Sequence, residues 1–192
     1  MEKNIIDPII EQMISENLKR RIIDFNDDFN ENTIYKLRYR LEKIVRQDDM
    51  MNIPMKSRKP ITIRIGSYGG YVHELSGALS LIERLKKRGY IINTECDTKA
   101  MSCGFVLLCS GVNRRVSPYA SILYHSVSAG AMGKVAQMID DVEESKRLNE
   151  MIKNYIVSKT NITKEELDSH KYDDWNISPE DCLKYGIATE IF

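Results

Sequence analysis

Several shortages limit what this chain of 192 residues can do. Only three histidines are present, so a catalytic imidazole has few candidates. The four cysteines show no metal-ligand spacing, which indicates reduced thiols rather than a metal site or a disulfide framework. Lys and Arg total 28 and Asp and Glu total 28, so no net charge favours nucleic acid or an anionic membrane. The histidines are His73, His125 and His170, and the cysteines are Cys96, Cys103, Cys109 and Cys182.

Targeting and cofactor-binding patterns are also missing. No apolar run approaches the length of a membrane span, and residues 1–8 lack the apolar core of a signal peptide. We therefore expect a cytoplasmic protein. There is no Gly-x-x-x-x-Gly-Lys loop to bind nucleotide phosphates, and we predict neither a metal nor a cofactor. The length and a hydrophobic content of 42% suit one domain over residues 1–192.

Strand patterns alternate with helix patterns along most of the chain. This order predicts an α/β fold with mostly parallel strands, right-handed crossovers and flanking helices. Predicted strands cover residues 21–25, 61–65, 90–96, 114–117, 121–124 and 188–191. Predicted helices cover residues 8–20, 34–45, 73–88 and 134–159, with a buried helix from Ser102, a short helix after Thr163 and another after Ser178.

The stretch around Ser102 has the pattern of a strand, a tight turn and a buried helix. The β-rich run 91–96 precedes it, and the apolar run 105–109 follows it. A hydroxyl at the first turn of a helix lies beside free backbone N–H groups and in the positive field of the helix terminus. Such a position suits a nucleophile whose attack creates an oxyanion, although many serines there are simply helix caps.

Other chemistry-bearing residues also follow predicted strands. Gly69 and Gly70 follow strand 61–65, and His125 ends strand 121–124. Because sites in parallel sheets form at the carboxyl ends of the strands, these residues should share one rim with Ser102. A serine nucleophile needs an imidazole base, a carboxylate that orients the base, and two N–H donors for the oxyanion.

The required groups all have candidates, and each has a structural interpretation as well. The N–H groups of Gly70 and Cys103 could form the oxyanion hole, and the loop 171–176 supplies Asp173 and Asp174 as carboxylates. Alternatively, the histidine could be structural, the aspartates solvated loop residues and the glycines a plain turn. We interpret His73 and His170 as structural because neither has a supporting partner, and we expect Lys99, a possible alternative base, to be exposed.

Four segments together resemble the ClpP family, the proteolytic subunits of Clp proteases. Residues 65–70 are similar to the family's glycine turn, and residues 100–104 to its nucleophile segment. Residues 117–125 and 174–188 are similar to its histidine segment and its carboxyl-terminal segment. The resemblance is colinear over 61–192, a catalytic core, whereas the helical residues 1–60 match poorly. The family suggests a crotonase-like α/β fold.

The resemblance implies a role for each matched residue. Ser102 would be the nucleophile, His125 the general base and Asp174 the orienting carboxylate, with Asp173 as a rival one position away. The oxyanion hole would be formed by Gly70 and Cys103. Substrate would be bound at Gly69, Ser126 and Val127, with the segment 126–133 aligning an extended peptide by backbone pairing.

The resemblance also implies an assembly and partners. Unfolded polypeptides would be cut inside a chamber made by two heptameric rings, a tetradecamer, and the long helix 134–159 would join ring to ring. A separate AAA+ unfoldase would use the ATP. The chain departs from the family where Thr62 and Arg64 replace aromatic residues of the unfoldase-docking strand. It departs again at Tyr68, which replaces a proline, and at Ser126–Val127, which replaces Gln-Pro.

Three other functions remain open at this point. The chain could be a non-catalytic or partner-dependent ClpP-like subunit, an interpretation that the altered docking strand favours. It could be a phage head-maturation protease with the same chemistry. An acyl-CoA enzyme of the same fold would use paired N–H groups too, but the sequence has no basic cluster suited to a nucleotide phosphate.

Overall fold

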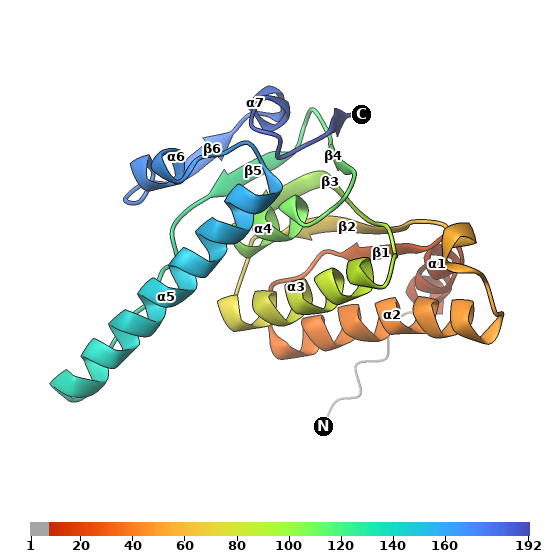
Figure 1. Cartoon of the computed structure of the whole chain (residues 1–192), viewed down its shortest axis with the longest axis horizontal. Helices are drawn as coiled ribbons and strands as arrows, with labels where there is room; N and C mark the ends of the chain where they lie inside the picture. Colours follow the sequence, from red (N-terminus) through yellow and green to blue (C-terminus); the bar gives the residue numbers. More distant parts are fainter. Residues whose placement is uncertain (1–7) are drawn as a thin grey trace.

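The computed structural model describes residues 8–192 and shows a mixed α/β fold, as the sequence predicts (Figure 1). Residues 1–7, which include most of the stretch inspected for a signal peptide, lie outside the described residues. The strands are β1 (Ile22–Phe25), β2 (Ile61–Ser67), β3 (Ile92–Met101), β4 (Arg114–Val116), β5 (Ser121–Tyr124), β6 (Trp175–Ile177) and β7 (Glu190–Ile191). The helices are α1 (Pro8–Lys19), α2 (Glu31–Met50), the short 3-10 turn η1 (Met55–Ser57), α3 (Val72–Lys87), α4 (Cys103–Cys109), α5 (Val135–Lys159), α6 (Lys164–Ser169) and α7 (Pro179–Lys184).

The sheet is mostly parallel, and β3 is its longest strand. The order β1-β2-β3-β4-β7 is parallel throughout, and β5 pairs in parallel with the far end of β3. β6 runs antiparallel to β5, the one antiparallel pairing among the strands of residues 8–192. The long strand β3 therefore pairs with two strands along its length, with β4 at residues 94–96 and with β5 at residues 99–101. This arrangement brings the ends of β2, β3 and β5 to one rim.

Helices cover the sheet because their apolar stripes match its buried positions. α2 and α3 lie side by side along one face (Figure 1). Leu37 and Leu41 of α2 and Ile82 of α3 are at most 1% exposed, and Ile61 and Ile63 of β2 are fully buried. Asn30 caps α2 by accepting a hydrogen bond from the Thr33 amide. All seven residues of α4 are buried, as expected for a helix within the core.

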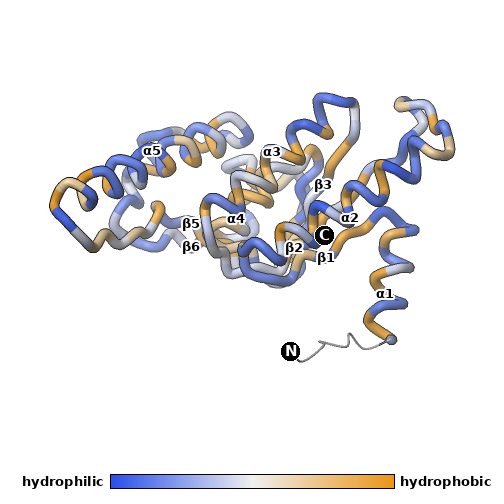
Figure 2. Tube along the Cα trace, turned by 90° about the horizontal axis from the view of Figure 1, so that it is seen from below, coloured by the Kyte–Doolittle hydropathy of each residue, from blue (hydrophilic) through white to orange (hydrophobic). Residues whose placement is uncertain are grey.

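α5 differs from the other long helices because only its second half joins the body. Its first half extends away from the sheet, and orange hydrophobic and blue hydrophilic segments alternate along it (Figures 1 and 2). The exposed apolar side chains there are Val135, Met138, Ile139 and Val142. Leu148, Ile152 and Ile156 pack against the body instead. Among residues 8–192, no helix is both long enough and apolar enough to cross a membrane.

Several strands differ in extent from the sequence prediction: β7 covers only residues 190–191 of the expected 188–191, and two other differences concern the site. The sequence pattern ends β3 at Cys96, but the strand continues to Met101 because residues 99–100 pair with Gly66 and Ser67 of a longer β2. The polar residues 97–99 therefore belong to a strand rather than to a turn. The expected loop 171–176 contains the start of β6, whose Trp175 pairs with Tyr124. Both corrections extend the sheet toward the rim that carries Ser102.

Candidate active site

Ser102 occupies a sharp elbow between β3 and α4. Its backbone has φ 54° and ψ −119°, a left-handed φ that few residues other than glycine adopt. Such a conformation costs about 1–3 kcal/mol and persists only where the surroundings enforce it. The Ser102 N–H donates to the Leu123 carbonyl of β5 at 3.0 Å. The same strand that fixes the elbow therefore leads, two residues later, to His125.

Small neighbours make room for this elbow. A Cβ on Gly69 would lie 2.7 Å from the Ser102 Cβ, and a Cβ on Gly104 would lie 3.0 Å from the Ser67 carbonyl oxygen. Ala100, two residues before the serine, is fully buried. A small residue on either side of a serine between strand and helix is the pattern of a nucleophile elbow, in which the hydroxyl is presented at the sheet rim.

A cavity of about 360 Å³ gathers most of the predicted site residues. Ser102, His125, Gly70, Cys103 and Val127 all contribute to its wall. Four further residues line the cavity, namely Val72, Val106, Ile152 and Ser128; only Ser128 belongs to a segment, 126–133, that the sequence assigned to substrate binding. Three of these four are aliphatic, and helical periodicity marks such residues as core, so no sequence pattern singles them out. The cavity wall therefore combines aliphatic side chains with the polar groups of the candidate site.

The two candidate oxyanion donors are available in this cavity. Cys103 begins α4, so its N–H has no partner within the helix, and no backbone carbonyl among residues 8–192 accepts from Gly70. The Cys103 thiol donates to the Gly70 carbonyl at 3.2 Å and so ties the glycine turn to the helix. Burial raises the pKa of this thiol to about 11, while the Ser102 hydroxyl and the Gly70 backbone oppose part of that shift. The thiol is therefore protonated at neutral pH.

His125 faces the cavity, but its ring is held by its neighbour. Its Nδ1 lies 2.6 Å from the Ser126 carbonyl oxygen. If Nδ1 carries the proton, the other ring nitrogen, Nε2, presents a lone pair, which is the tautomer a general base needs. No hydrogen bond joins His125 to the Ser102 hydroxyl within the described chain.

The structure does not join Asp174 to His125. Asp174 is exposed and forms no hydrogen bond or ion pair among the described residues. The β5–β6 register pairs Tyr124 with Trp175, so the next antiparallel step sets His125 opposite Asp174. Asp173 instead contacts His170, with Nδ1 and Oδ2 3.2 Å apart. The backbone thus favours Asp174 over Asp173, although the side chain is not in contact.

The remaining predicted candidates lie apart from the serine or are already occupied. Lys99 places its ammonium over the Tyr68 ring, 4.2 Å from the centroid. His170 stacks on Trp175 at 4.6 Å. In the predicted substrate segment, the Val127 N–H donates to Asn149 at 3.0 Å and the Ser126 carbonyl contacts His125. Two of the groups expected to pair with a peptide are therefore engaged within the chain.

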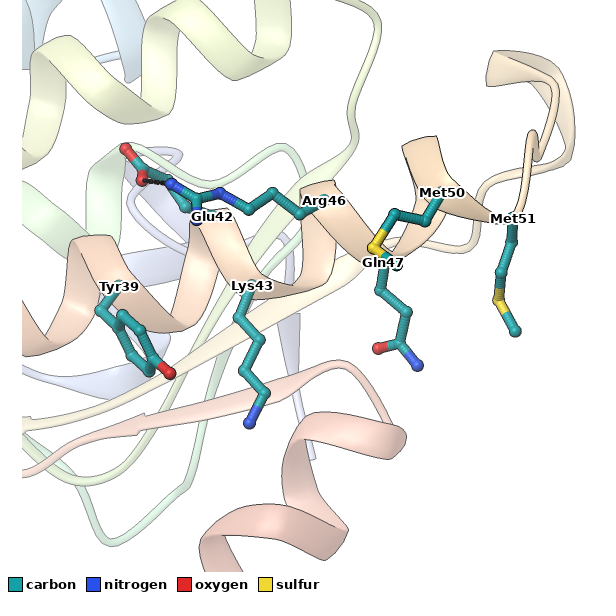
Figure 3. A pocket seen from close by; sticks show the side chains of 7 residues that line it. All are labelled: Tyr39, Glu42, Lys43, Arg46, Gln47, Met50 and Met51. Carbon is teal, nitrogen blue, oxygen red and sulfur yellow. Dashed lines mark hydrogen bonds and ion pairs between the residues drawn. The ribbon is translucent and has the colours of Figure 1, made fainter.

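A larger cavity, of about 490 Å³, lies on the outer face of α2 (Figure 3). Tyr39, Lys43 and Gln47 point to the same side of the helix, toward α1, whereas Glu42 pairs with Arg46. It contains no serine, cysteine or histidine, so it offers no nucleophile and imidazole pair. Across residues 8–192 there is also no cluster of three His, Cys, Asp or Glu side chains that could hold a metal.

The fold and the cavity define a class: α/β proteins with a serine at a strand–helix elbow and an imidazole facing the same cavity. The sequence model of the family described as Clp protease matches residues 9–192. The chain therefore belongs to the Clp protease family. The match includes residues 9–60, where the sequence motifs gave little resemblance. Two strains of Dehalococcoides mccartyi each have a relative named ATP-dependent Clp protease proteolytic subunit, 27% identical over 91% of this chain and 82% of the relative.

Proposed function

We propose that this chain is a serine endopeptidase and acts as the proteolytic subunit of a Clp protease. One observation carries the proposal: Ser102 at its strained elbow, His125 and the free amides of Gly70 and Cys103 share one cavity. Family membership and the names of the relatives give independent support. The proposed substrate is polypeptide, because this constellation can attack a backbone carbonyl, and the family resemblance implies that the polypeptide is unfolded.

The chemistry follows from the placement of these groups. The His125 imidazole takes the Ser102 hydroxyl proton as the oxygen attacks a peptide carbonyl carbon. The resulting oxyanion is stabilised by the N–H groups of Gly70 and Cys103. The C–N bond then breaks, the imidazolium gives its proton to the leaving amine, and an acyl-enzyme remains on Ser102. Water, deprotonated by His125, hydrolyses that ester and restores the serine.

Asp174 completes this mechanism only after a local movement. A carboxylate at Nδ1 would fix the tautomer and stabilise the imidazolium better than a carbonyl does, because it carries a full negative charge. In the proposal, His125 exchanges the Ser126 carbonyl for Asp174, its neighbour in the β5–β6 register. The same exchange releases the Ser126 carbonyl to pair with an extended substrate.

The wall of the cavity indicates which residue precedes the cleaved bond. Val72, Val106, Val127 and Ile152 give it an aliphatic lining, and none of the lining side chains is a Lys, Arg, Asp or Glu. A charged side chain would lose its hydration there without a partner. We therefore expect cleavage after apolar side chains of moderate size and poor cleavage after acidic or basic ones.

The exposed parts of the chain support an oligomer. The first half of α5 leaves Val135, Ile139 and Val142 open to solvent, an apolar stripe that a second copy would cover. We propose that α5 joins two heptameric rings, as the family resemblance implies. The proposed unfoldase partner would meet an ionic rather than an aromatic strand, since Arg64 pairs with Asp24 at 2.7 Å.

A second candidate function is a partner-dependent subunit that is inactive by itself. The observation that favours it is the missing contact between His125 and Asp174. Association with other subunits would then move the His125 segment into its working position. This alternative keeps the same serine and cavity, so it differs from the first candidate in the conditions under which the site works.

Hydrolysis of a fluorogenic peptide with an apolar residue before the cleaved bond tests the proposal. Ser102→Ala should abolish hydrolysis while leaving the oligomer intact, because the hydroxyl is chemical rather than structural. Ser128→Ala is the matched control, since Ser128 lines the same cavity without the elbow conformation. It should retain activity within about threefold, as expected for a cavity-wall change that leaves the reacting groups in place. Full activity of Ser102→Ala would refute the proposal.

A further inference from the structure

The glycine turn that carries one oxyanion donor is held from outside by a residue of the β1–α2 connection. The Phe29 N–H donates to the Gly69 carbonyl at 2.7 Å, and the Phe29 carbonyl accepts from the Tyr71 N–H at 2.8 Å. These two bonds form a parallel bridge between Phe29 and Gly70. Phe29 lies within residues 1–60, the segment that the motif comparison left without a role.

These bonds fix the direction of the Gly70 amide. A trans peptide is planar, so its N–H points opposite to its C=O. The Gly69 carbonyl and the Gly70 N–H belong to the same peptide unit. Because Phe29 holds that carbonyl, the Gly70 N–H must point away from Phe29. Gly70 lines the Ser102 cavity, so that opposite direction is available to an oxyanion.

The following peptide unit is fixed at both ends as well. Its N–H, on Tyr71, donates to Phe29, and its carbonyl, on Gly70, accepts from the Cys103 thiol. Two adjacent glycines with φ of 119° and 139° would otherwise rotate easily, since neither has a side chain to restrict it. The backbone of Phe29 occupies the space a side chain would need, 2.5 Å from an ideal Cβ on Gly70.

Phe29 is itself firmly anchored. Its side chain is fully buried, and its ring meets the Phe25 ring edge to face at a centroid distance of 4.8 Å. Phe25 pairs with Ile65 of β2, the strand that leads into the glycine turn. The anchor and the turn are thus both attached to the β1–β2 ladder, which keeps their spacing constant.

We propose that Phe29 is a positioning residue for oxyanion stabilisation, acting through its backbone, with the Cys103 thiol as a second tie. This inference rests on the proposed function of Ser102. Phe29 touches no substrate. It orients the Gly70 N–H before substrate arrives, and its hydrogen bond to the Gly69 carbonyl polarises the shared peptide, which makes that N–H a stronger donor.

An amide-to-ester exchange separates the backbone role of Phe29 from its role in the core. Replacing Phe29 with 3-phenyllactic acid by nonsense suppression keeps the ring and deletes the N–H; it also makes the Asp28 carbonyl, which accepts from the Thr33 hydroxyl, a weaker acceptor. We expect kcat for peptide hydrolysis to fall about tenfold, a partial loss of one oxyanion donor, with KM changed less than about twofold. The pH dependence of kcat should stay the same, because His125 is untouched.

Phe29→Leu gives the opposite change, since it loses the ring and keeps both backbone bonds. The kcat of Phe29→Leu should stay within about twofold of the wild-type kcat, even if its melting temperature falls. Phe25→Leu is the control for core damage, because Phe25 is as buried as Phe29 and makes no bond to the turn.

The hydrogen bond from the Cys103 thiol to the Gly70 carbonyl is tested by Cys103→Ala, with Cys103→Ser as the conservative variant. The kcat should fall in the alanine variant and be close to the wild-type value in the serine variant.

The outcomes separate two failures. If the wild-type chain hydrolyses peptides and both the ester variant and Cys103→Ala match its kcat, the positioning role is wrong and the proposed function stands. If kcat falls in Phe29→Leu and Phe25→Leu as much as in the ester variant, the effect is loss of core packing, which also refutes the inference. If the wild-type chain is inert in every assembly state, the proposed function fails and the inference fails with it.

Discussion

The candidate site has two halves, the candidate oxyanion hole and the candidate base with its carboxylate, and only the first has its groups held by hydrogen bonds in the proposed arrangement. On the oxyanion side, the Gly69–Tyr71 turn is tied by two bonds to Phe29 and by one to Cys103. On the base side, the His125 ring hydrogen-bonds to the carbonyl of its own neighbour, Ser126, and Asp174 is exposed and unpaired within the described chain. Under the proposed function, the first half is already positioned in a single chain, whereas the second half still needs His125 and Asp174 to come into contact.

The difference follows from where each half lies in the fold. The glycine turn and Ser102 follow β2 and β3, adjacent strands inside the parallel sheet. His125 and Asp174 follow β5 and precede β6, at the sheet edge. From His125 the chain continues through the irregular segment 126–134 into the half of α5 that projects away from the body. A half-site attached to a projecting helix can respond to what that helix contacts, so assembly and catalysis would be linked through the base.

The largest effect within this comparison should come from Asp174→Asn. If the carboxylate orients His125 during the reaction, as proposed, kcat should fall on the order of 10⁴-fold, the loss typical of a serine–histidine site deprived of that charge. Asp173→Asn is the matched control, since Asp173 contacts His170 and should change kcat less than about threefold. Steady-state hydrolysis of the fluorogenic peptide measures both.

A small effect of Asp174→Asn would change the account of the base. Activity within about tenfold of wild type would mean that the Ser126 carbonyl is a sufficient partner for Nδ1. The contact seen in the structure would then be the working one, and Asp174 would be a surface residue. The same result would weaken the partner-dependent alternative, which rests on that contact being unproductive.

A smaller effect on activity is expected from Gly70→Ala, on the preformed side. A Cβ there would lie 2.5 Å from the Phe29 carbonyl oxygen, at a φ of 139° that alanine avoids. The turn must shift, so kcat should fall about 10²-fold, and the strain should lower the free energy of unfolding by about 1–3 kcal/mol. Denaturant unfolding and peptide hydrolysis measure the two quantities.

Gly77→Ala serves as the control for that glycine change. Gly77 lies within α3, and an ideal Cβ on it meets nothing within 4 Å. Alanine should therefore stabilise the helix by about 0.5–1 kcal/mol and leave kcat unaltered. If Gly70→Ala behaved like Gly77→Ala in both assays, the turn would be neither tight nor part of the oxyanion hole.

Much of the fold and of the preformed half could be predicted from the sequence. Alternating strand and helix patterns indicated the parallel sheet, and position after a strand brought Gly70, Ser102 and His125 to one cavity. The continuation of β3 was missed because Asp97, Thr98 and Lys99 are polar, like a turn. Lys99 pairs with Gly66 of β2 and Ser121 of β5, which are distant in the sequence, and Asp97 and Thr98 form the irregular step between Cys96 and Lys99 in the β2–β3 ladder.

Two features of the site had no sequence pattern to reveal them. The role proposed for Phe29 uses backbone groups that every residue except proline carries, so its side chain predicts only burial. The contact between His125 and Ser126 depends on a ring orientation, and the motif predicted Asp174 as the partner instead. Helical periodicity in the sequence indicates which face of a helix is apolar, but not what covers that face. In the first half of α5, Val135 and Ile139 follow the helical spacing and are nevertheless exposed.

The proposed chemistry depends above all on Ser102 being an activated nucleophile, and covalent labelling probes that property without needing the substrate. The purified protein is incubated with a fluorophosphonate, and intact mass and peptide mapping locate any adduct. We predict a single adduct on Ser102, formed faster in the assembled oligomer than in the dissociated chain, and no adduct in Ser102→Ala. A folded oligomer that stays unlabelled, with or without added Clp unfoldase, or one labelled at another serine, would contradict the proposed chemistry.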